Sequence, residues 1–179
     1  MKTTQILIAG FGGQGLLFSG KFLAYKGLVE ELQVSWLPSY GPEMRGGTAN
    51  CNIILSDTPV GSPIITVPDV LVAMNLPSLQ KYVNSVRKGG QIYVDSSLID
   101  LKVERDDVDV FYIPATQMAK EAGIGSLANM IIVGHLLENH PELSFVGAAD
   151  VVDKLVPPKK AALKELNMKA LNLGRDYNK

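Results

Sequence analysis

The beginning of the chain alternates between short apolar runs and segments rich in glycine or polar residues. Residues 5–9 form an apolar run with the length of a buried strand, and a glycine-rich turn at 10–15 follows it. Residues 16–32 have a helical pattern that is apolar on most faces, and residues 34–37 return to a strand-like run. This order of strand, glycine turn, helix and strand predicts a βαβ unit.

The next part of the chain has a different periodicity. Two prolines and three glycines in 38–47 predict an irregular loop. Residues 48–55 alternate between apolar and polar side chains, which is the pattern of a strand with one face buried. Turn-forming residues occupy 56–61, and the apolar residues of 62–66 then predict a hairpin partner for the preceding strand.

From residue 70 to the end of the chain, strands and helices alternate. Further strands are predicted at 70–74, 91–95 and 110–113, and further helices at 76–86, 116–122, 127–138, 146–155 and 160–173. Such alternation predicts an α/β fold with three layers, a mainly parallel sheet, a Rossmann-like first βαβ unit and an antiparallel hairpin. With 179 residues and neither an internal repeat nor a linker, residues 1–179 are expected to form a single domain.

Composition narrows the functional classes. A net charge of −1 argues against a nucleic-acid binder, and an aromatic content of 7% argues against a base-stacking surface. The single cysteine, Cys51, excludes a disulfide framework and a cysteine-ligated iron–sulfur cluster. No apolar run approaches the ~20 residues of a membrane-spanning helix, and the N-terminal segment does not resemble a signal peptide. We therefore expect a cytoplasmic protein that binds neither nucleic acid nor membrane.

The glycine-rich turn provides the first candidate site. Gly10, Gly12 and Gly15 fit the pattern GxGxxG, directly after a strand and at the start of a helix, and Gly13 and Gln14 lie within it. Glycines at such a turn let the backbone approach a phosphate, and the helix N-terminus offers unpaired N–H groups to it. The Gln14 amide can donate a further hydrogen bond to a phosphate or to a thiamine-bearing partner. Alternatively, the glycines serve only to pack the helix against the sheet.

Two common nucleotide sites fit the sequence poorly. A dinucleotide enzyme needs an acidic residue at the end of the second strand, but residues 36–40 contain none, and Glu30 and Glu31 come earlier. Residues 15–21 match the spacing GxxxxGK of a P-loop, but Phe22 follows where a magnesium-binding hydroxyl is required. Neither NAD(P) nor a P-loop nucleotide is favoured.

The irregular loop that follows the second strand provides the second candidate site. Arg45 lies there between Glu43 and two glycines. A guanidinium group on such a loop can bind a carboxylate or phosphate with two parallel hydrogen bonds. The loop and the glycine-rich turn each follow a strand, so both should lie at the carboxyl edge of the sheet, where ligands bind. Contact with a partner chain is an equally good interpretation of Arg45.

The remaining polar candidates are better explained by structure. Asp95, Ser96 and Ser97 end a strand at the same edge, where capping and turn formation are common for these residue types. His135 and His140 lack a base or nucleophile partner in the sequence, so we interpret both as structural or solvated. Cys51 falls on the apolar side of its strand and is expected to be a packed thiol.

Three motifs together carry a family resemblance. GFGGQG after the first strand, PSYGPEMRGG after the second and the later PDVLVAMNLPSL resemble the gamma subunit of 2-oxoacid:ferredoxin oxidoreductases. The resemblance covers most of the chain and extends to Asn167, Ala170 and Gly174 in the last helix.

The resemblance implies a specific function. Enzymes of this family oxidatively decarboxylate a 2-oxoacid to an acyl-CoA, and the motifs are most similar to members acting on 2-oxoglutarate, then to those acting on branched-chain 2-oxoacids. Thiamine diphosphate, Mg and iron–sulfur clusters are held by partner alpha, beta and in some cases delta (ferredoxin-like) subunits, and ferredoxin accepts the electrons. The gamma subunit contributes to the coenzyme A site and to assembly, has no catalytic residue of its own, and is expected to be inactive in isolation.

Two other interpretations stay open at this point. A stand-alone NAD(P)- or nucleotide-binding Rossmann-like protein would explain the GxGxxG pattern. A structural scaffold with an empty glycine loop would explain the absence of a complete catalytic set.

Overall fold

The computed structural model describes residues 3–39 and 48–178. These residues form a single six-stranded sheet in the spatial order β2-β3-β1-β4-β5-β6. Its strands are β1 (Thr3–Phe11), β2 (Gln33–Ser39), β3 (Thr48–Ser56), β4 (Val70–Ala73), β5 (Gln91–Asp95) and β6 (Asp109–Ile113). The α-helices are α1 (Leu16–Val29), α2 (Leu76–Tyr82), α3 (Ala115–Glu121), α4 (Ala128–Asn139), α5 (Ala148–Leu155) and α6 (Ala161–Arg175). Short 3₁₀ turns follow α2 (η2, Val83–Ser85) and precede α6 (η3, Pro158–Lys160).

The sheet is parallel except for β3, which runs antiparallel to both β1 and β2 and lies between them. β1, β4, β5 and β6 are neighbours in parallel register. The predicted first βαβ unit is therefore present, but its two strands are separated by an inserted strand. This insertion is a long-range pairing that the local sequence pattern does not contain.

The predicted antiparallel hairpin exists, but with different strands. β2 and β3 form it, with Gln33 opposite Ser56 and Ser39 opposite Asn50. The prediction that residues 62–66 form a strand is wrong, since they have no regular secondary structure. The reason is geometric: β1 and β2 already occupy both sides of β3, so no edge remains for a returning strand.

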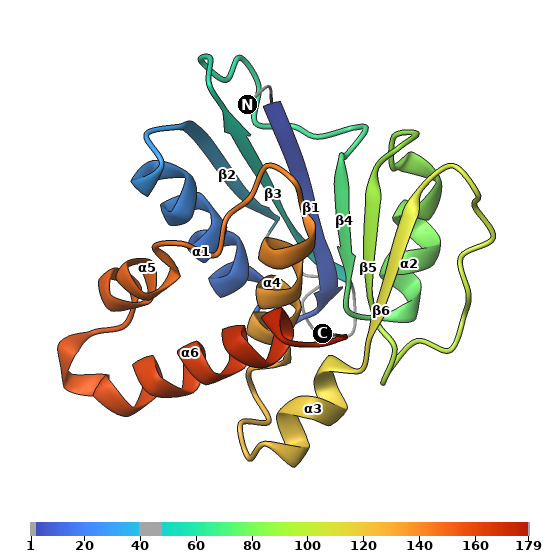
Figure 1. Ribbon diagram of the computed structural model, residues 1–179. Coiled ribbons are helices and arrows are strands. Elements are labelled where there is room, and N and C mark those ends of the chain that lie inside the picture. The colour runs from blue at the N-terminus through green and yellow to red at the C-terminus, as the bar shows by residue number, and fades with distance from the viewer. Residues whose placement is uncertain (1–2, 40–47, 179) are drawn as a thin grey trace.

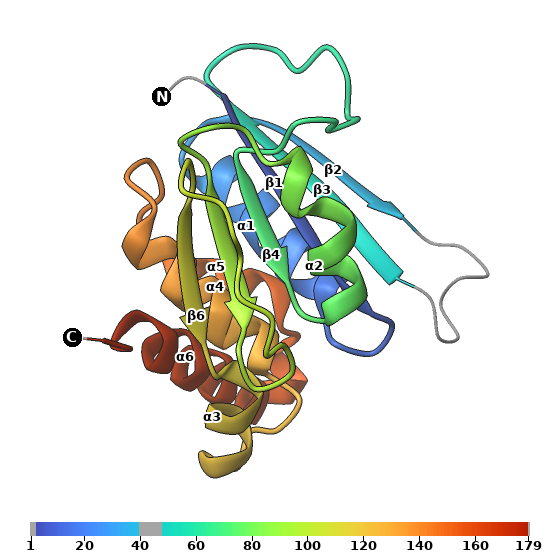
Figure 2. The same ribbon diagram turned by 90° about the vertical axis from the view of Figure 1, so that its right-hand side faces the viewer.

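Helices cover both faces of the sheet and give the predicted three layers (Figures 1 and 2). α1 and α4 pack on one face, where the larger hydrophobic core lies, and α2 packs against β1 and β4 on the other face. Residues of β3 confirm the alternation: Cys51, Ile53 and Leu55 are buried in the larger core. Among the described residues, no helix has the length and apolar character needed to cross a bilayer.

α6 lies outside α4 and packs closely across it (Figure 1). Two glycines permit this approach. A Cβ atom on Gly134 would overlap the carbonyl group of Leu171, and one on Gly174 would overlap the carbonyl oxygen of Ile131. α4 is consequently enclosed between the sheet and α6, which explains why its sequence is apolar on every face.

Candidate functional site

The connections of the sheet reverse direction between β1 and β4. From β1 the chain passes through α1 on one face toward β2, whereas from β4 it passes through α2 on the other face toward β5. In open α/β sheets, such a reversal leaves a crevice at the carboxyl ends of the two strands, and ligands bind there. The glycine-rich turn after β1 lies at this position.

The backbone of the glycine-rich turn matches the prediction. Gly13 and Gly15 have φ angles of 91° and 76°, in the left-handed region that favours glycine. Gly15 is the N-cap of α1, no side chain caps the helix, and its first turn has no acidic residue. The first N–H groups of α1 therefore keep their capacity to bind an anion, and the helix dipole favours negative charge there.

Gln14 anchors the turn to the neighbouring strand. Its Oε1 accepts a hydrogen bond from the N–H of Phe11 at 2.6 Å, and its Nε2 donates to the carbonyl oxygen of Met74 at 2.8 Å. Gly10 makes room for this amide, because a Cβ atom there would overlap Gln14 Oε1. The predicted donor is thus engaged across the crevice, although an amide nitrogen has a second N–H group.

Asn129 supports the turn from the side of α4, and sequence reasoning missed it. Its Nδ2 donates to the carbonyl oxygen of Gly15 at 3.0 Å and to Ser19 Oγ at 2.9 Å. The side chain is 3% exposed, and its Nδ2 would lie 2.6 Å from a Cβ atom on Gly15. An asparagine at the start of an otherwise apolar helix was the available signal.

A hollow of about 270 Å³ opens beside the turn, lined by Phe11, Gly12, Gly13, Gly15, Leu16, Leu17 and Ala49. The structure therefore brings three of the predicted glycines, Gly12, Gly13 and Gly15, to one hollow at the carboxyl edge, whereas Gly10 is buried and does not line it. Arg45 lies outside the described residues. The strands on either side of it end near the hollow, since Ser39 closes β2, and Thr48 is opposite Phe11 in the register of β1 and β3.

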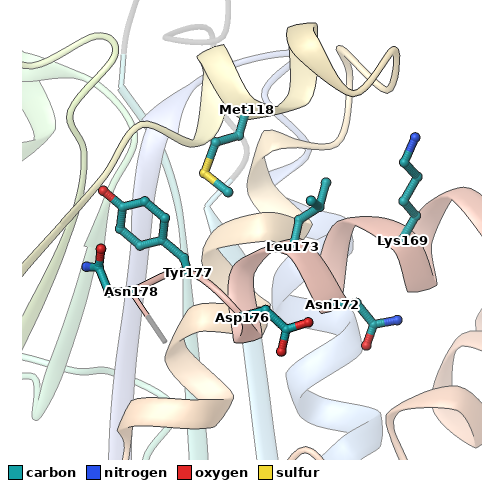
Figure 3. Close-up of a pocket in the computed structure, with 7 residues that line it drawn as sticks. All are labelled: Met118, Lys169, Asn172, Leu173, Asp176, Tyr177 and Asn178. Atoms are coloured by element: carbon teal, nitrogen blue, oxygen red, sulfur yellow. The ribbon is translucent and has the colours of Figure 1, made fainter.

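A wider hollow of about 640 Å³ lies between α3 and α6 (Figure 3). Met118 reaches from α3 toward Leu173 and Tyr177. The charged groups there are already engaged: Lys169 donates to the carbonyl oxygen of Ala122 at 2.8 Å, and Asp176 pairs with Arg175. This hollow has neither a glycine turn nor the N-terminus of a long helix, both of which favour anion binding. The hollow at the carboxyl edge of the sheet is therefore the better candidate for the functional site.

Asp95 has the capping role predicted for it. Its carboxylate accepts hydrogen bonds from Thr116 Oγ1 at 2.6 Å and from the N–H of Ser97 at 3.1 Å. These contacts join the end of β5 to the start of α3. Cys51 is a buried thiol whose pKa is raised to about 12 by burial, as expected for a packed side chain.

Both histidines are buried, and burial lowers the pKa of each. His135 Nδ1 lies 3.1 Å from the carbonyl oxygen of Gly174, at the crossing of α4 and α6. His140 Nδ1 accepts a hydrogen bond from the N–H of Glu142 at 3.2 Å. Neither side chain lines the hollow at the glycine turn, and within 3–39 and 48–178 no group of three metal-binding side chains is present.

Comparisons with known proteins identify the family of this chain. The family model described as pyruvate ferredoxin/flavodoxin oxidoreductase matches residues 5–177. Ketoisovalerate oxidoreductase subunit VorA of Methanothermobacter marburgensis is 37% identical over 98% of this chain, and this chain spans 37% of that protein's length. 2-Oxoglutarate synthase subunit KorC of the same organism is 35% identical over 96% of this chain and 95% of its own length.

Two solved structures are similar throughout the chain. The gamma subunit of keto/oxoacid ferredoxin oxidoreductase from Geobacter sulfurreducens superposes with a TM-score of 0.84 and 30% identity, over 97% of this chain and 95% of that one. A 2-oxoglutarate:ferredoxin oxidoreductase from Magnetococcus marinus, solved with 2-oxoglutarate, coenzyme A and succinyl-CoA bound, has a TM-score of 0.86 and 25% identity. That match covers 98% of this chain and 31% of the larger one.

Proposed function

The chain belongs to the pyruvate ferredoxin/flavodoxin oxidoreductase family, and we propose that it is the gamma component of a complex that oxidatively decarboxylates a 2-oxoacid to an acyl-CoA. 2-Oxoglutarate is the first proposed substrate, and a branched-chain 2-oxoacid is the second. Relatives named for each of these substrates support testing both. Residues 1–179 would act as one gamma-type domain.

The glycine turn is the observation that carries this proposal, and its contribution would be to bind coenzyme A. Coenzyme A supplies the thiol that takes up the acyl group, and its phosphates suit the unpaired N–H groups at the start of α1. The left-handed Gly13 and Gly15 let the backbone approach closely, and the adjacent hollow has room for part of the ligand. The proposed contacts are Gly10, Gly12, Gly13, Gln14, Gly15 and Arg45.

Other parts of the reaction would take place in partner chains. The sequence has one cysteine, and it is buried, so iron–sulfur clusters require ligands from elsewhere. We therefore assign thiamine diphosphate, Mg and the clusters to alpha, beta and, where present, delta subunits, with ferredoxin as the electron acceptor. The role of this chain would be to hold coenzyme A and to support assembly in the cytoplasm.

The fold offers little support for the NAD(P) alternative. In a dinucleotide-binding fold the second strand lies beside the first, and an acidic residue at its end binds the ribose. Here β3 separates β2 from β1, and residues 33–39 contain no acid. The ribose-binding position of that fold is thus missing from this sheet.

The test is an anaerobic purification of the complex through this chain from its native cells. Iron, thiamine diphosphate and coenzyme A-dependent dye reduction are then measured with a panel of 2-oxoacids. Co-purification of partners with activity supports the proposal, and the panel identifies the substrate. A chain that elutes alone, binds a nicotinamide nucleotide and lacks iron would overturn it.

Substitution of Arg45 then separates ligand binding from partner contact. In the assembled complex, Arg45→Ala should raise the KM for coenzyme A on the order of tenfold, because a bidentate contact to a phosphate is lost. Arg45→Lys is the matched variant, which keeps the charge but not the planar pair of donors. Unchanged kinetics with intact assembly would remove Arg45 from the ligand site, and failure to assemble would place it at the subunit interface.

A further inference from the structure

Two residues near the glycine turn, Asn129 and Asn75, carry a buried polar atom without a hydrogen-bond partner among the described residues. Among the described residues, four buried side-chain atoms have no hydrogen-bond partner: Asn75 Nδ2, Ser78 Oγ, Asn129 Oδ1 and Asn167 Oδ1. Asn129 contacts Gly15 directly, and Asn75 follows Met74, the residue that binds Gln14. Buried polar groups in native proteins are nearly always paired, so such a group is a candidate for contact with a water, ion or ligand.

Asn75 is the most informative of these residues. It is 2% exposed, and its Oδ1 accepts a hydrogen bond from the N–H of Ser78 at 2.8 Å, which caps α2. This bond identifies the oxygen of the amide, because the nitrogen cannot accept from an N–H group. Nδ2 is therefore a donor without an acceptor, and the hydroxyl of Ser78 beside it also has no partner among the described residues.

The strand register places Asn75 in the crevice. Ala9 is opposite Ala73 in the parallel pair β1–β4, and the N–H of Met74 still donates to the carbonyl oxygen of Ala9 at 2.9 Å. Two residues further, Asn75 comes opposite Phe11. Residues opposite each other in neighbouring strands point to the same face, so a continued register would direct Phe11 and Asn75 to the α2 side of the sheet.

Phe11 also connects Asn75 to the candidate site. Its side chain is 40% exposed and lines the hollow at the glycine turn. Asn75 is 2% exposed and does not line the hollow, so contact of its Nδ2 with a ligand there requires local movement at the end of β1. The amide would then approach the ligand from the α2 side of the crevice, while the start of α1 approaches from the other side.

We propose that Asn75 is a ligand-binding residue that donates a hydrogen bond from Nδ2 to a phosphate oxygen of the coenzyme A-class ligand held at the start of α1. This inference rests on the proposed function and adds a contact on the α2 side of the same site. A neutral donor opposite a helix N-terminus suits an anion, because both present N–H groups and neither adds a negative charge. In the absence of ligand, Nδ2 lacks an acceptor from the described residues.

Two substitutions separate the donor from the cap. Asn75→Asp keeps an oxygen to cap α2 and replaces the donor with a negative charge, and Asn75→Ser keeps a neutral cap without the amide. Asn167→Asp is the matched control, since Asn167 is a buried amide with an unpartnered atom on α6, away from the crevice. Each variant is incorporated into the assembled complex under anaerobic conditions.

Coenzyme A binding is measured by calorimetry without a 2-oxoacid, together with the KM for each substrate and the unfolding temperature. We expect the Kd for coenzyme A to rise on the order of tenfold or more for Asn75→Asp and by roughly three- to tenfold for Asn75→Ser. The KM for the 2-oxoacid and the unfolding temperature of the Asn75 variants should stay at wild-type values. Asn167→Asp should keep the wild-type Kd and KM values, while its unfolding temperature falls because the hydrogen bond from Asn167 to the carbonyl oxygen of Leu163 is lost and a carboxylate is buried.

Three results would overturn the assignment of Asn75. Wild-type affinity for coenzyme A in both Asn75 variants would show that Nδ2 makes no contact with the ligand. A higher KM for the 2-oxoacid together with a lower unfolding temperature would show a structural role instead. Failure of both variants to assemble would show the same. Absence of coenzyme A binding by the wild-type complex would reject the proposed function itself, which distinguishes the two failures.

Discussion

The glycine turn after β1 and the crossing of α4 with α6 both depend on glycine, but for different physical reasons. At the turn, Gly13 and Gly15 have positive φ angles, and a Cβ atom on Gly13 would meet open space. At the crossing, Gly134 and Gly174 lie within regular helices, and a Cβ atom on either would overlap the backbone of the other helix. The turn needs conformational freedom, whereas the crossing needs space.

This difference separates function from stability. The turn borders a hollow and contacts Asn129, which carries an unpartnered polar atom, and both are properties of a binding site. The crossing is closed and encloses the most apolar helix of the chain. Substitutions at the crossing should therefore change mainly the free energy of unfolding, and substitutions at the turn should change mainly ligand affinity.

Gly174→Ala should have the largest effect on stability. The added methyl group overlaps Ile131 of α4, so the two helices must separate and the core must repack. We expect the free energy of unfolding to fall by about 3 kcal/mol, measured by urea denaturation of the chain. Gly125→Ala is the control, because a Cβ atom there meets nothing within 4 Å. Equal midpoints for both variants would contradict the close crossing.

Gly15→Ala should affect binding more than stability. A left-handed conformation costs a non-glycine residue about 1–2 kcal/mol, and the new methyl group also presses on Asn129. The KM for coenzyme A in the assembled complex should rise on the order of tenfold, since the N–H groups of α1 lose their orientation. A lower free energy of unfolding with an unchanged KM for coenzyme A would contradict the assignment of the turn to binding.

Acid should destabilise the folded chain through its two buried histidines, His135 at the crossing of α4 and α6 and His140 at the end of α4. Burial lowers the pKa of His135 and His140, so the folded protein keeps both histidines neutral while the unfolded chain takes up protons near pH 6.5. Their stabilising effect is complete above about pH 6.5 and decreases as the pH falls toward the lower folded pKa. Each histidine can contribute at most about 1.4 kcal/mol per pH unit.

Urea midpoints at pH 7.5 and 5.5 measure this dependence in the wild-type protein and in His140→Gln, which removes one of the two histidines. The midpoint should be lower at pH 5.5, and the difference should shrink in the variant. A midpoint that rises on acidification would show that the histidines gain, rather than lose, interactions on protonation.

The labelling rate of Cys51 should show the smallest difference between variants of the glycine turn and variants of the α4–α6 crossing. Its pKa of about 12 and its burial keep the thiol protonated and inaccessible in the folded state. A thiol reagent at pH 8 should therefore label it only when the structure opens. Labelling should be faster in Gly174→Ala than in wild type and only slightly faster in Gly15→Ala. Immediate labelling of the wild-type protein would contradict the packed position of β3.

Local periodicity was sufficient to predict most elements. The strand at 91–95 was placed with its observed bounds, and the helices at 127–138 and 160–173 differ from α4 and α6 by at most two residues. The failure at 62–66 has a clear origin: a short apolar run is compatible with a strand, but strand formation also requires a free sheet edge. The glycine turn was predictable because its pattern follows a strand directly.

The sequence by itself determined the order of strands and helices, the glycine turn at the start of α1 and the lack of cysteine ligands for a cluster. These features depend on neighbouring residues or on composition, which the chain carries in every conformation. Tertiary structure alone decided that β3 lies between β1 and β2, that Gly134 and Gly174 allow α6 to cross α4, and that Asn129 contacts the turn at Gly15. Those relations join residues far apart in the chain, and only packing of the sheet and helices brings them within contact distance.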